Sequence, residues 1–346
     1  PMEPQVVSVA SDNEGINVDD LARKAKGARF LYVLPNFQNP TGRSMSEARR
    51  AALVAAAADT GLPLVEDNPY GDLWFDAPPP APLTARHPDG AIYLGSFSKV
   101  LAPGLRLGYL VAPKAVYPKL LQAKQAADLH SPGFNQRLVS EVLKGGFLDR
   151  HVPTIRALYK AQCSAMLGAL EREMQGLGVQ WNAPDGGMFL WLRLPAGMSA
   201  TALLPQAVER GVAFVPGAAF YAGAADDRTL RLSFVTASAS QIDAGIAALA
   251  QTVRTLRPEL PQELADILGK TLAKSPLERY QTGGELAADL RRVAAVLSPS
   301  DDADGAPANA PVMAGRDDED AMLATVVTPA PVSSTVPERA DADIRL

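Results

Sequence analysis

The chain has 346 residues, enough for about two domains, and its 47% hydrophobic and 21% charged residues are ordinary for a globular protein. The net charge of -5 and the lack of a basic stripe argue against a nucleic-acid partner. The longest apolar stretch, Ala51–Ala58, is far shorter than the roughly 18 residues of a membrane span, and no signal-peptide pattern is seen. We therefore expect a cytoplasmic protein without a membrane partner. The single cysteine, Cys163, excludes an internal disulfide, and no Cys/His cluster has the spacing of a metal site.

Residues 1–130 alternate between short apolar strands and helices, which we interpret as one domain. Helices are expected at Val18–Lys26 and at Ser46–Thr60, the second of them opened by Ser46. Five strands are expected, at Gln5–Ala10, Phe30–Leu34, Leu62–Glu66, Ile92–Gly95 and Leu107–Val111. Strands that are apolar almost throughout and alternate with helices indicate an α/β fold with a mainly parallel sheet, covered on both faces.

Residues 131–257 combine longer helices with a few strands, which is typical of a smaller α+β domain. The segments Met188–Leu194 and Thr229–Val235 alternate apolar and polar residues as half-buried strands do. Helices are expected at Pro153–Gln175, Ala200–Arg210 and Ala239–Thr255.

The character of the chain changes after Pro258. Two short amphipathic helices, Gln262–Lys274 and Gly284–Val296, make up an expected appendage over residues 258–297. Residues 298–346 are rich in Ala, Pro, Asp, Ser and Val and contain no aromatic residue, a composition that cannot bury a core. We expect this tail to be disordered.

Lys99 is the first candidate for chemistry, because it follows the strand Ile92–Gly95 through a tight serine-containing turn. A lysine at the end of a buried strand loses solvent, which lowers its pKa and makes its amine nucleophilic. The hydroxyls of Ser96 and Ser98 can donate to a phosphate, and the Arg106 guanidinium can bind two phosphate oxygens. A surface lysine with a nearby structural arginine explains the same residues, and for Lys99 alone that simpler interpretation is favoured.

Two further groups of residues reverse that preference. Asp67 ends the strand Leu62–Glu66, and its carboxylate can keep a pyridine nitrogen protonated. Tyr70 follows three residues later, and its phenol can bond a ring oxygen. Asn39, after the strand Phe30–Leu34, can donate to the same oxygen. Each pattern alone is common, but their order and spacing together are specific.

These motifs resemble the class I/II aminotransferases, which use pyridoxal 5'-phosphate (PLP) and have PLP fold type I. The resemblance covers about residues 5–255 and is greatest to the LysN-like branch of 2-aminoadipate aminotransferases. The segments that carry it are Asn36-Phe-Gln-Asn39-Pro-Thr-Gly42, Asp67-x-x-Tyr70, Leu94-Gly-Ser96-Phe-Ser98-Lys99-Val-Leu-Ala-Pro-Gly-Leu-Arg106-Leu-Gly108 and Lys124-Gln-Ala-Ala-Asp-Leu129.

The resemblance implies a role for each matched residue. Lys99 would attach the cofactor covalently and then move the proton of the substrate Cα. Asp67 would pair with the pyridinium nitrogen, and Asn39 and Tyr70 would bond the ring 3-oxygen. Ser96, Ser98 and Arg106 would hold the phosphate.

Arg231 matches the family arginine that binds the substrate α-carboxylate, with Asn39 beside it. The strand pattern agrees, because Leu230, Leu232 and Phe234 share one face and leave Arg231 on the other. The implied reaction moves an amino group between an amino acid (2-aminoadipate, aromatic or aliphatic) and a 2-oxo acid such as 2-oxoglutarate. A homodimer is implied if the protein is complete.

The chain also departs from the family pattern. Relatives carry a segment before the point that matches residue 5, and it supplies a phosphate-binding helix N-terminus and two strands of the sheet. We therefore expect an apolar sheet edge, weak cofactor binding and impaired turnover.

Residues 260–296 resemble the last two helices of a bacterial Ser/Thr protein kinase C-lobe. Kinase activity is excluded because no glycine-rich ATP loop, His-Arg-Asp motif or Asp-Phe-Gly motif is present. Two other interpretations stay open. The first is a PLP-sensing regulatory domain, against which the enzyme-like Phe37-Gln38-Asn39 counts. The second is an inactive fragment or fusion of an aminotransferase with a kinase tail.

Overall fold

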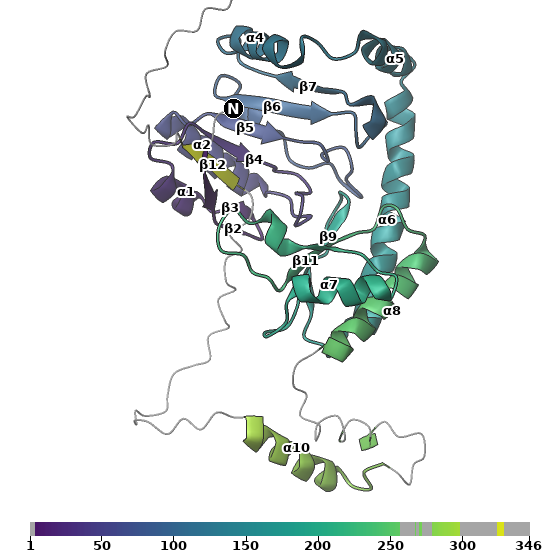
Figure 1. Cartoon of the computed structure of the whole chain (residues 1–346). Coiled ribbons are helices and arrows are strands. Elements are labelled where there is room, and N and C mark those ends of the chain that lie inside the picture. The colour runs from purple at the N-terminus through teal and green to yellow at the C-terminus, as the bar shows by residue number, and fades with distance from the viewer. Residues whose placement is uncertain (1–3, 257–266, 268–269, 272–278, 298–323, 329–346) are drawn as a thin grey trace, which may run out of the picture.

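The computed structural model describes residues 4–256, 267, 270–271, 279–297 and 324–328 (Figure 1). The expected helix Gln262–Lys274 therefore lies almost wholly outside the described residues. The second expected helix is α10, Gly283–Leu297, which Figure 1 shows apart from the remaining elements. The proposed division into domains stays a prediction.

A six-stranded sheet organises the N-terminal part of the chain, with the strand order β1-β12-β4-β5-β6-β7. Its strands are β1 Gln5–Val9, β4 Phe30–Val33, β5 Leu64–Asp67, β6 Ala91–Ser96, β7 Gly108–Val111 and β12 Ala324–Thr328. The β4–β5 and β5–β6 pairs are parallel. The expected strands are confirmed to within two residues at each end. The sheet is mixed rather than mainly parallel, because β7 runs antiparallel to β6 and β12 runs antiparallel to both of its neighbours.

One expectation about the tail is wrong for five residues. The main chain of 324–328 pairs with β1 on one side and β4 on the other, antiparallel to both. The sequence Ala-Thr-Val-Val-Thr has high strand propensity because it is mostly β-branched, a local feature that the average composition of the tail conceals. The rest of 298–346 lies outside the described residues.

Two helices, α1 and α2, pack on this sheet. Helix α1, Val18–Lys24, is capped by Asn17, and α2, Glu47–Thr60, is capped by Ser46, which accepts from the Arg49 amide. Their apolar residues join the buried strand residues in one core: Leu21, Leu31, Val33, Leu53, Ala57 and Leu64 are among its members. A hairpin, β2 Ser11–Asp12 and β3 Gly15–Ile16, precedes α1, and a single turn, α3 Leu83–Arg86, follows β5.

The second sheet has the order β10-β11-β9-β8 and is antiparallel. Its strands are β8 Gln180–Trp181, β9 Phe189–Arg193, β10 Val215–Pro216 and β11 Thr229–Ser233. Helices α6 Phe147–Met174, α7 Ala200–Glu209 and α8 Ala239–Leu256 pack with it around a separate core. Helix α6 runs from the end of α5 down to α8 and so passes both sheets (Figure 1).

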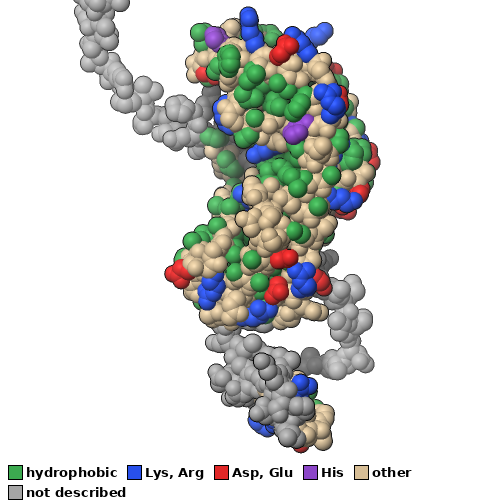
Figure 2. Space-filling view, turned by 90° about the vertical axis from the view of Figure 1, so that its right-hand side faces the viewer, with side chains coloured by type: hydrophobic (Ala, Val, Ile, Leu, Met, Phe, Trp, Pro, Cys, Tyr) green, Lys and Arg blue, Asp and Glu red, His purple; other side chains and the backbone are tan. Residues whose placement is uncertain are grey.

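Apolar side chains gather at the end of the molecule that β7 forms with two helices the sequence pattern did not predict, α4 Tyr117–Asp128 and α5 Gly133–Lys144. Figure 2 shows this end as a patch of hydrophobic side chains. The exposed members are Tyr109, Leu110, Val111, Tyr117, Leu121, Phe134 and Leu138. Among the described strands, β7 thus lies at the edge of the sheet and is apolar. Among the helices of the described residues, none has the length and apolar character to cross a membrane.

Candidate active site

The candidate site lies where β4, β5 and β6 end. Because these strands are parallel, their carboxyl ends meet at one edge of the sheet, and the loop after each strand carries a predicted residue. Asn39 follows β4, Asp67 is the last residue of β5, and Lys99 follows β6.

Lys99 lies in the turn between β6 and β7. The Ser98 amide donates to Ser96 Oγ at 3.1 Å, which closes the turn just before the lysine. Lys99 Nζ lies 6.0 Å from the centroid of the Tyr70 ring. Among the described residues, no carboxylate is within ion-pair distance of this amine, so the structure leaves it available for reaction.

Tyr70 is held by a small apolar cluster under the site. It is 5% exposed and packs edge-on against Phe189 of β9, with 5.8 Å between ring centroids. Phe37 and Val152 of α6 belong to the same cluster, which therefore joins both parts of the molecule. Burial raises the pKa of the Tyr70 phenol, an effect that the nearby Arg231 opposes. The phenol is accordingly protonated at neutral pH.

Asp67 accepts one hydrogen bond, from a tyrosine that the sequence analysis did not single out. Tyr32 Oη of β4 donates to Asp67 Oδ2 at 2.5 Å. Burial raises the pKa of Asp67, and the bond from Tyr32 opposes that rise. Within the described part of the chain, Asp67 Oδ1 has no hydrogen-bond partner.

The neighbouring acid, Glu66, has a structural role. It is fully buried and accepts from the amides of Leu83 and Thr84 and from the Thr84 hydroxyl, at 3.1, 2.9 and 2.8 Å. Glu66 therefore caps the first turn of α3. Because side chains alternate along a strand, Asp67 points to the opposite face of the sheet.

Asn39 and Arg231, the two residues expected to bind a substrate carboxylate, are in contact. Arg231 Nη1 donates to Asn39 Oδ1 at 2.5 Å, and the Asn39–Pro40 peptide bond is cis. The guanidinium carbon lies 4.2 Å from the centroid of the Phe189 ring. Arg231 Nε is buried and has no partner among the described residues. Burial lowers the pKa of Arg231, so this cation is partly desolvated and its Nε–H is an unused donor.

A chain of side-chain hydrogen bonds that runs from buried Arg50 through two asparagines to Tyr93 was also missed. Arg50 is fully buried, and its Nη2 donates to Asn36 Oδ1 at 2.5 Å. Asn36 Nδ2 donates to Asn68 Oδ1, and Asn68 Nδ2 donates to Tyr93 Oη, both at 2.8 Å. Arg50 also binds the main-chain oxygens of residues 35 and 45, which bracket the loop that carries Asn39. No motif marks these residues, because their contacts depend on tertiary structure.

Arg106 stands apart from the other expected phosphate ligands. It is exposed, has a φ of 49°, and its Nη1 donates to the Pro103 oxygen at 3.5 Å. A non-glycine residue in this left-handed region costs backbone energy, and such residues are frequent at functional sites. The structure brings Lys99 and Tyr70 together, and Asn39 and Arg231 together, while Arg106 makes no contact with an acidic group in the described part of the chain.

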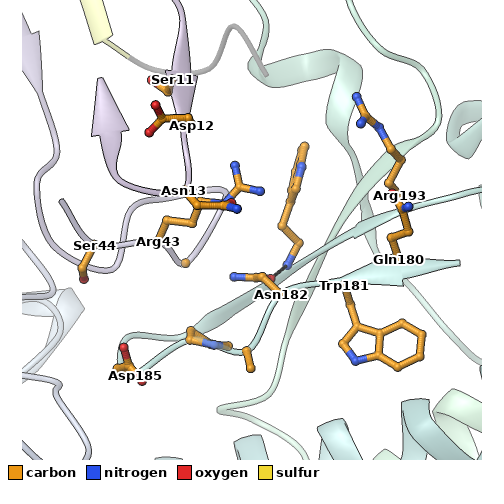
Figure 3. Close-up of a pocket in the computed structure, with 14 residues that line it drawn as sticks. Ser11, Asp12, Asn13, Arg43, Ser44, Gln180, Trp181, Asn182, Asp185 and Arg193 are labelled. Carbon is orange, nitrogen blue, oxygen red and sulfur yellow. Dashed lines mark hydrogen bonds between the residues drawn. The ribbon is translucent and has the colours of Figure 1, made fainter. Parts of the chain in front are cut away.

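A polar cavity of about 630 Å³ lies beside the turn that ends at Gly42 (Figure 3). Asp12, Asn13, Arg43 and Ser44 reach it from one side, and Gln180, Asn182 and Arg193 reach it from the β8–β9 region. Lys99, Asp67 and Arg231 do not line this cavity. This cavity is therefore separate from the candidate active site.

The model of the family "Aminotransferase class I and II" matches residues 2–249. The chain belongs to this family. Since the match ends before residue 258, the kinase resemblance of residues 260–296 lies outside it and stays a prediction.

Known aminotransferases are among the relatives of this class I/II chain. It is 42% identical over 260 residues to "Aromatic-amino-acid aminotransferase 1" of Thermococcus litoralis, covering 73% of this chain and 62% of the relative. Its fold matches the crystal structure of LysN, the α-aminoadipate aminotransferase of Thermus thermophilus, complexed with N-(5'-phosphopyridoxyl)-L-leucine. That match has a TM-score of 0.69 and 42% identity, and it covers 72% of this chain and 66% of the LysN chain. The fold is thus that of PLP fold type I.

A regulator is similar as well. The chain is 35% identical over 248 residues to the uncharacterized HTH-type transcriptional regulator YisV of Bacillus subtilis, covering 71% of this chain and 51% of YisV. The chain spans about half to two thirds of the length of these three relatives.

Proposed function

We propose that this chain carries the cofactor- and substrate-binding core of a PLP-dependent aminotransferase. The observation that supports this most is the convergence of Lys99, Asp67 and the Asn39–Arg231 pair at one edge of the sheet. Bound PLP supplies an electron sink that stabilises negative charge at the substrate Cα.

The residues at this edge fit that cofactor because several of their polar groups are unused within the described residues. These are the Lys99 amine, Asp67 Oδ1, the Asn39 amide nitrogen and Arg231 Nε. The amine can react with a carbonyl carbon, and the acid can accept a hydrogen bond from a protonated pyridine nitrogen. The two donors can bind a phenolic oxygen and a carboxylate.

Each residue then has a distinct task in the proposal. Lys99 attaches the cofactor and moves the proton of the substrate Cα. Asp67 Oδ1 accepts from the protonated pyridine nitrogen, so the positive charge there is retained. Asn39 Nδ2 and the Tyr70 phenol bond the ring 3-oxygen.

The remaining residues hold the two anionic groups. Ser96 and Ser98 donate to the phosphate, and Arg106 turns from its exposed position to join them. Arg231 binds the substrate α-carboxylate, which takes the place of Asn39 Oδ1 as the acceptor for one of its nitrogens. A partly desolvated guanidinium binds an anion more strongly than an exposed one.

The proposed substrates are an amino acid, either 2-aminoadipate or an aromatic or aliphatic one, and a 2-oxo acid such as 2-oxoglutarate. The similarity to the Thermococcus aromatic-amino-acid aminotransferase and to the Thermus α-aminoadipate aminotransferase supports aromatic amino acids and 2-aminoadipate. We also propose that the complete protein is a homodimer.

A second candidate is a PLP-sensing regulatory domain, which the similarity to YisV supports. One experiment separates the two. PLP is added to the chain, the visible absorption is recorded, and a panel of amino acids follows, then 2-oxoglutarate. An absorption band that an amino acid removes and 2-oxoglutarate restores supports transamination. A band that no amino acid changes supports sensing, and the lack of any band contradicts both.

A further inference from the structure

Tyr32 and Asp67 lie on neighbouring strands and on the same face of the sheet. The parallel register pairs Tyr32 of β4 with Val65 of β5, so Asp67 is one strand repeat further along on the same side. Burial alternates in agreement, since Leu31, Val33 and Leu64 are buried and the site-facing residues between them are half-buried.

The contact between the two side chains occupies one carboxylate oxygen and leaves the other free. Tyr32 Oη donates to Asp67 Oδ2 at 2.5 Å, and no described residue bonds Oδ1. A carboxylate can rotate about its Cβ–Cγ bond. A short hydrogen bond to a group fixed on the adjacent strand restricts this rotation and so sets the plane of the carboxylate.

We propose that Tyr32 is a positioning residue, whose phenol anchors Asp67 Oδ2 and so directs Oδ1 toward the pyridine nitrogen of the cofactor. This inference rests on the proposed function. It adds a residue that touches neither substrate nor cofactor and acts only through Asp67.

The anchor has an electrostatic consequence as well as a geometric one. Asp67 and the pyridine nitrogen compete for one proton, and the electron sink needs that proton on nitrogen. A donor to Asp67 stabilises its ionised form and so leaves the proton on the ring. Burial acts in the opposite direction and raises the pKa of Asp67. The Tyr32 bond therefore offsets the cost of placing a carboxylate in a half-buried site.

The other titratable groups around the pair do not supply this donor. Tyr70 interacts electrostatically with both Tyr32 and Asp67, and Arg231 in turn with Tyr70. Neither Tyr70 nor Arg231 forms a hydrogen bond to Asp67 within the described residues. Burial and the nearby Asp67 carboxylate raise the pKa of Tyr32, so the phenol stays protonated and remains a donor.

The first arm of the test needs no cofactor. The full chain is labelled with ¹³C at the aspartate carboxyl carbons, the Asp67 resonance is assigned by its loss in Asp67→Asn, and its titration is followed by NMR. Tyr32→Phe is expected to move the Asp67 midpoint to higher pH. Tyr159→Phe removes a half-buried phenol of α6 that is not hydrogen-bonded to Asp67, and it is expected to leave the midpoint unchanged. Equal midpoints in wild type and Tyr32→Phe would overturn the proposal that Tyr32 anchors Asp67.

The second arm of the test measures the protonation of the cofactor's pyridine nitrogen. PLP labelled with ¹⁵N at the pyridine nitrogen is added to each protein, and the chemical shift reports protonation of that nitrogen. Tyr32→Phe is expected to shift it toward the unprotonated value, while Tyr159→Phe keeps the wild-type value. An unchanged shift in Tyr32→Phe would refute the proposed role. If none of the proteins binds PLP while Tyr32→Phe raises the Asp67 midpoint, the proposed function is wrong and the anchoring of Asp67 by Tyr32 is supported.

A third variant covers the case in which Tyr32→Phe does not fold. Replacement of Tyr32 by 3-fluorotyrosine keeps the shape of the ring and makes the phenol a stronger donor. The Asp67 midpoint is then expected to fall below that of the wild type. A midpoint that does not move would contradict the anchor without any loss of folding.

Discussion

Arg231 Nη1 bonds Asn39 Oδ1 at 2.5 Å, and 192 residues of chain separate the two. One residue belongs to β11 of the second sheet and the other to the loop after β4. The bond therefore ties the two parts of the molecule together at the point where a substrate carboxylate is proposed to bind.

The first prediction concerns this pair. Arg231→Ala is expected to weaken amino-acid binding by about 2–4 kcal/mol, or about 30- to 1,000-fold, because the charged guanidinium that donates to the substrate carboxylate is lost. The measurement is a spectral titration of the PLP-loaded chain with amino acid. Arg172→Ala, which removes an exposed ion pair with Asp243, is the control and should bind normally. Unchanged affinity in Arg231→Ala would show that Arg231 does not bind the substrate carboxylate.

The second prediction concerns cofactor attachment. Borohydride reduction of the chain with PLP is expected to leave a pyridoxyl group on Lys99, located by peptide mass spectrometry. Lys99→Ala should lose the label. Lys124→Ala should keep it, since Lys124 is an exposed lysine already paired with Asp128. Equal labelling of wild type and Lys99→Ala would show that another lysine reacts.

A third prediction separates the two adjacent acids. Glu66→Ala is expected to lower the free energy of unfolding by about 2–4 kcal/mol, because buried donors at the start of α3 lose their acceptor. Asp67→Asn is expected to cost less than about 1 kcal/mol, because the site-facing carboxylate has a single partner. Urea unfolding of both variants tests this. A larger loss of stability in Asp67→Asn than in Glu66→Ala would contradict the structural role given to Glu66.

The fourth prediction concerns the packing between the two parts of the molecule. Gly187 has a φ of 75°, and a Cβ there would lie 2.5 Å from Phe37 Cβ. Gly211 has a similar φ of 82°, but a Cβ there would meet no atom within 4 Å. Both alanine variants bear the left-handed backbone cost of roughly 1–2 kcal/mol. Gly187→Ala should lose about 1–3 kcal/mol more, because its core contact is overpacked. Similar unfolding free energies would mean that Phe37 moves aside.

The fifth prediction is a pH dependence of stability. Asp226 accepts from Arg193 and Arg228, and although burial acts to raise its pKa, these bonds hold the pKa below the usual value. A lowered pKa in the folded state means stability that is present above pH about 4 and is lost as pH falls through the folded value. Asp226→Asn should therefore destabilise the chain by about 1–3 kcal/mol at pH 7, with a difference that shrinks below pH 4. A difference that is constant with pH would contradict the ionic origin.

The location of the residues proposed for chemistry could be predicted from the sequence, but that of the residues in contact with them could not. Lys99, Asp67 and Asn39 follow three apolar strands, and parallel pairing alone is enough to bring them to one edge. Tyr32 and Arg50 were missed because their roles depend on register and burial, which a local pattern does not contain. A buried arginine in an amphipathic helix looks in sequence like any exposed one.

Two features of the fold were missed. The sequence of helix α4 has little contrast between an apolar and a polar face, whereas α5 has such a contrast and was overlooked. Strand β12 was hidden in a tail whose average composition is that of a disordered chain.

The strand β5 places Glu66 and Asp67 on opposite faces, one supporting the fold and one proposed for chemistry. The assignment rests on the two-residue period of the strand. Insertion or deletion of a single codon inside β5 would exchange the faces, leaving α3 without its cap and the site without its acid. Point substitution can remove one role at a time, whereas a one-residue change in length removes both, so we expect the length of β5 to be less tolerant of change than its side chains.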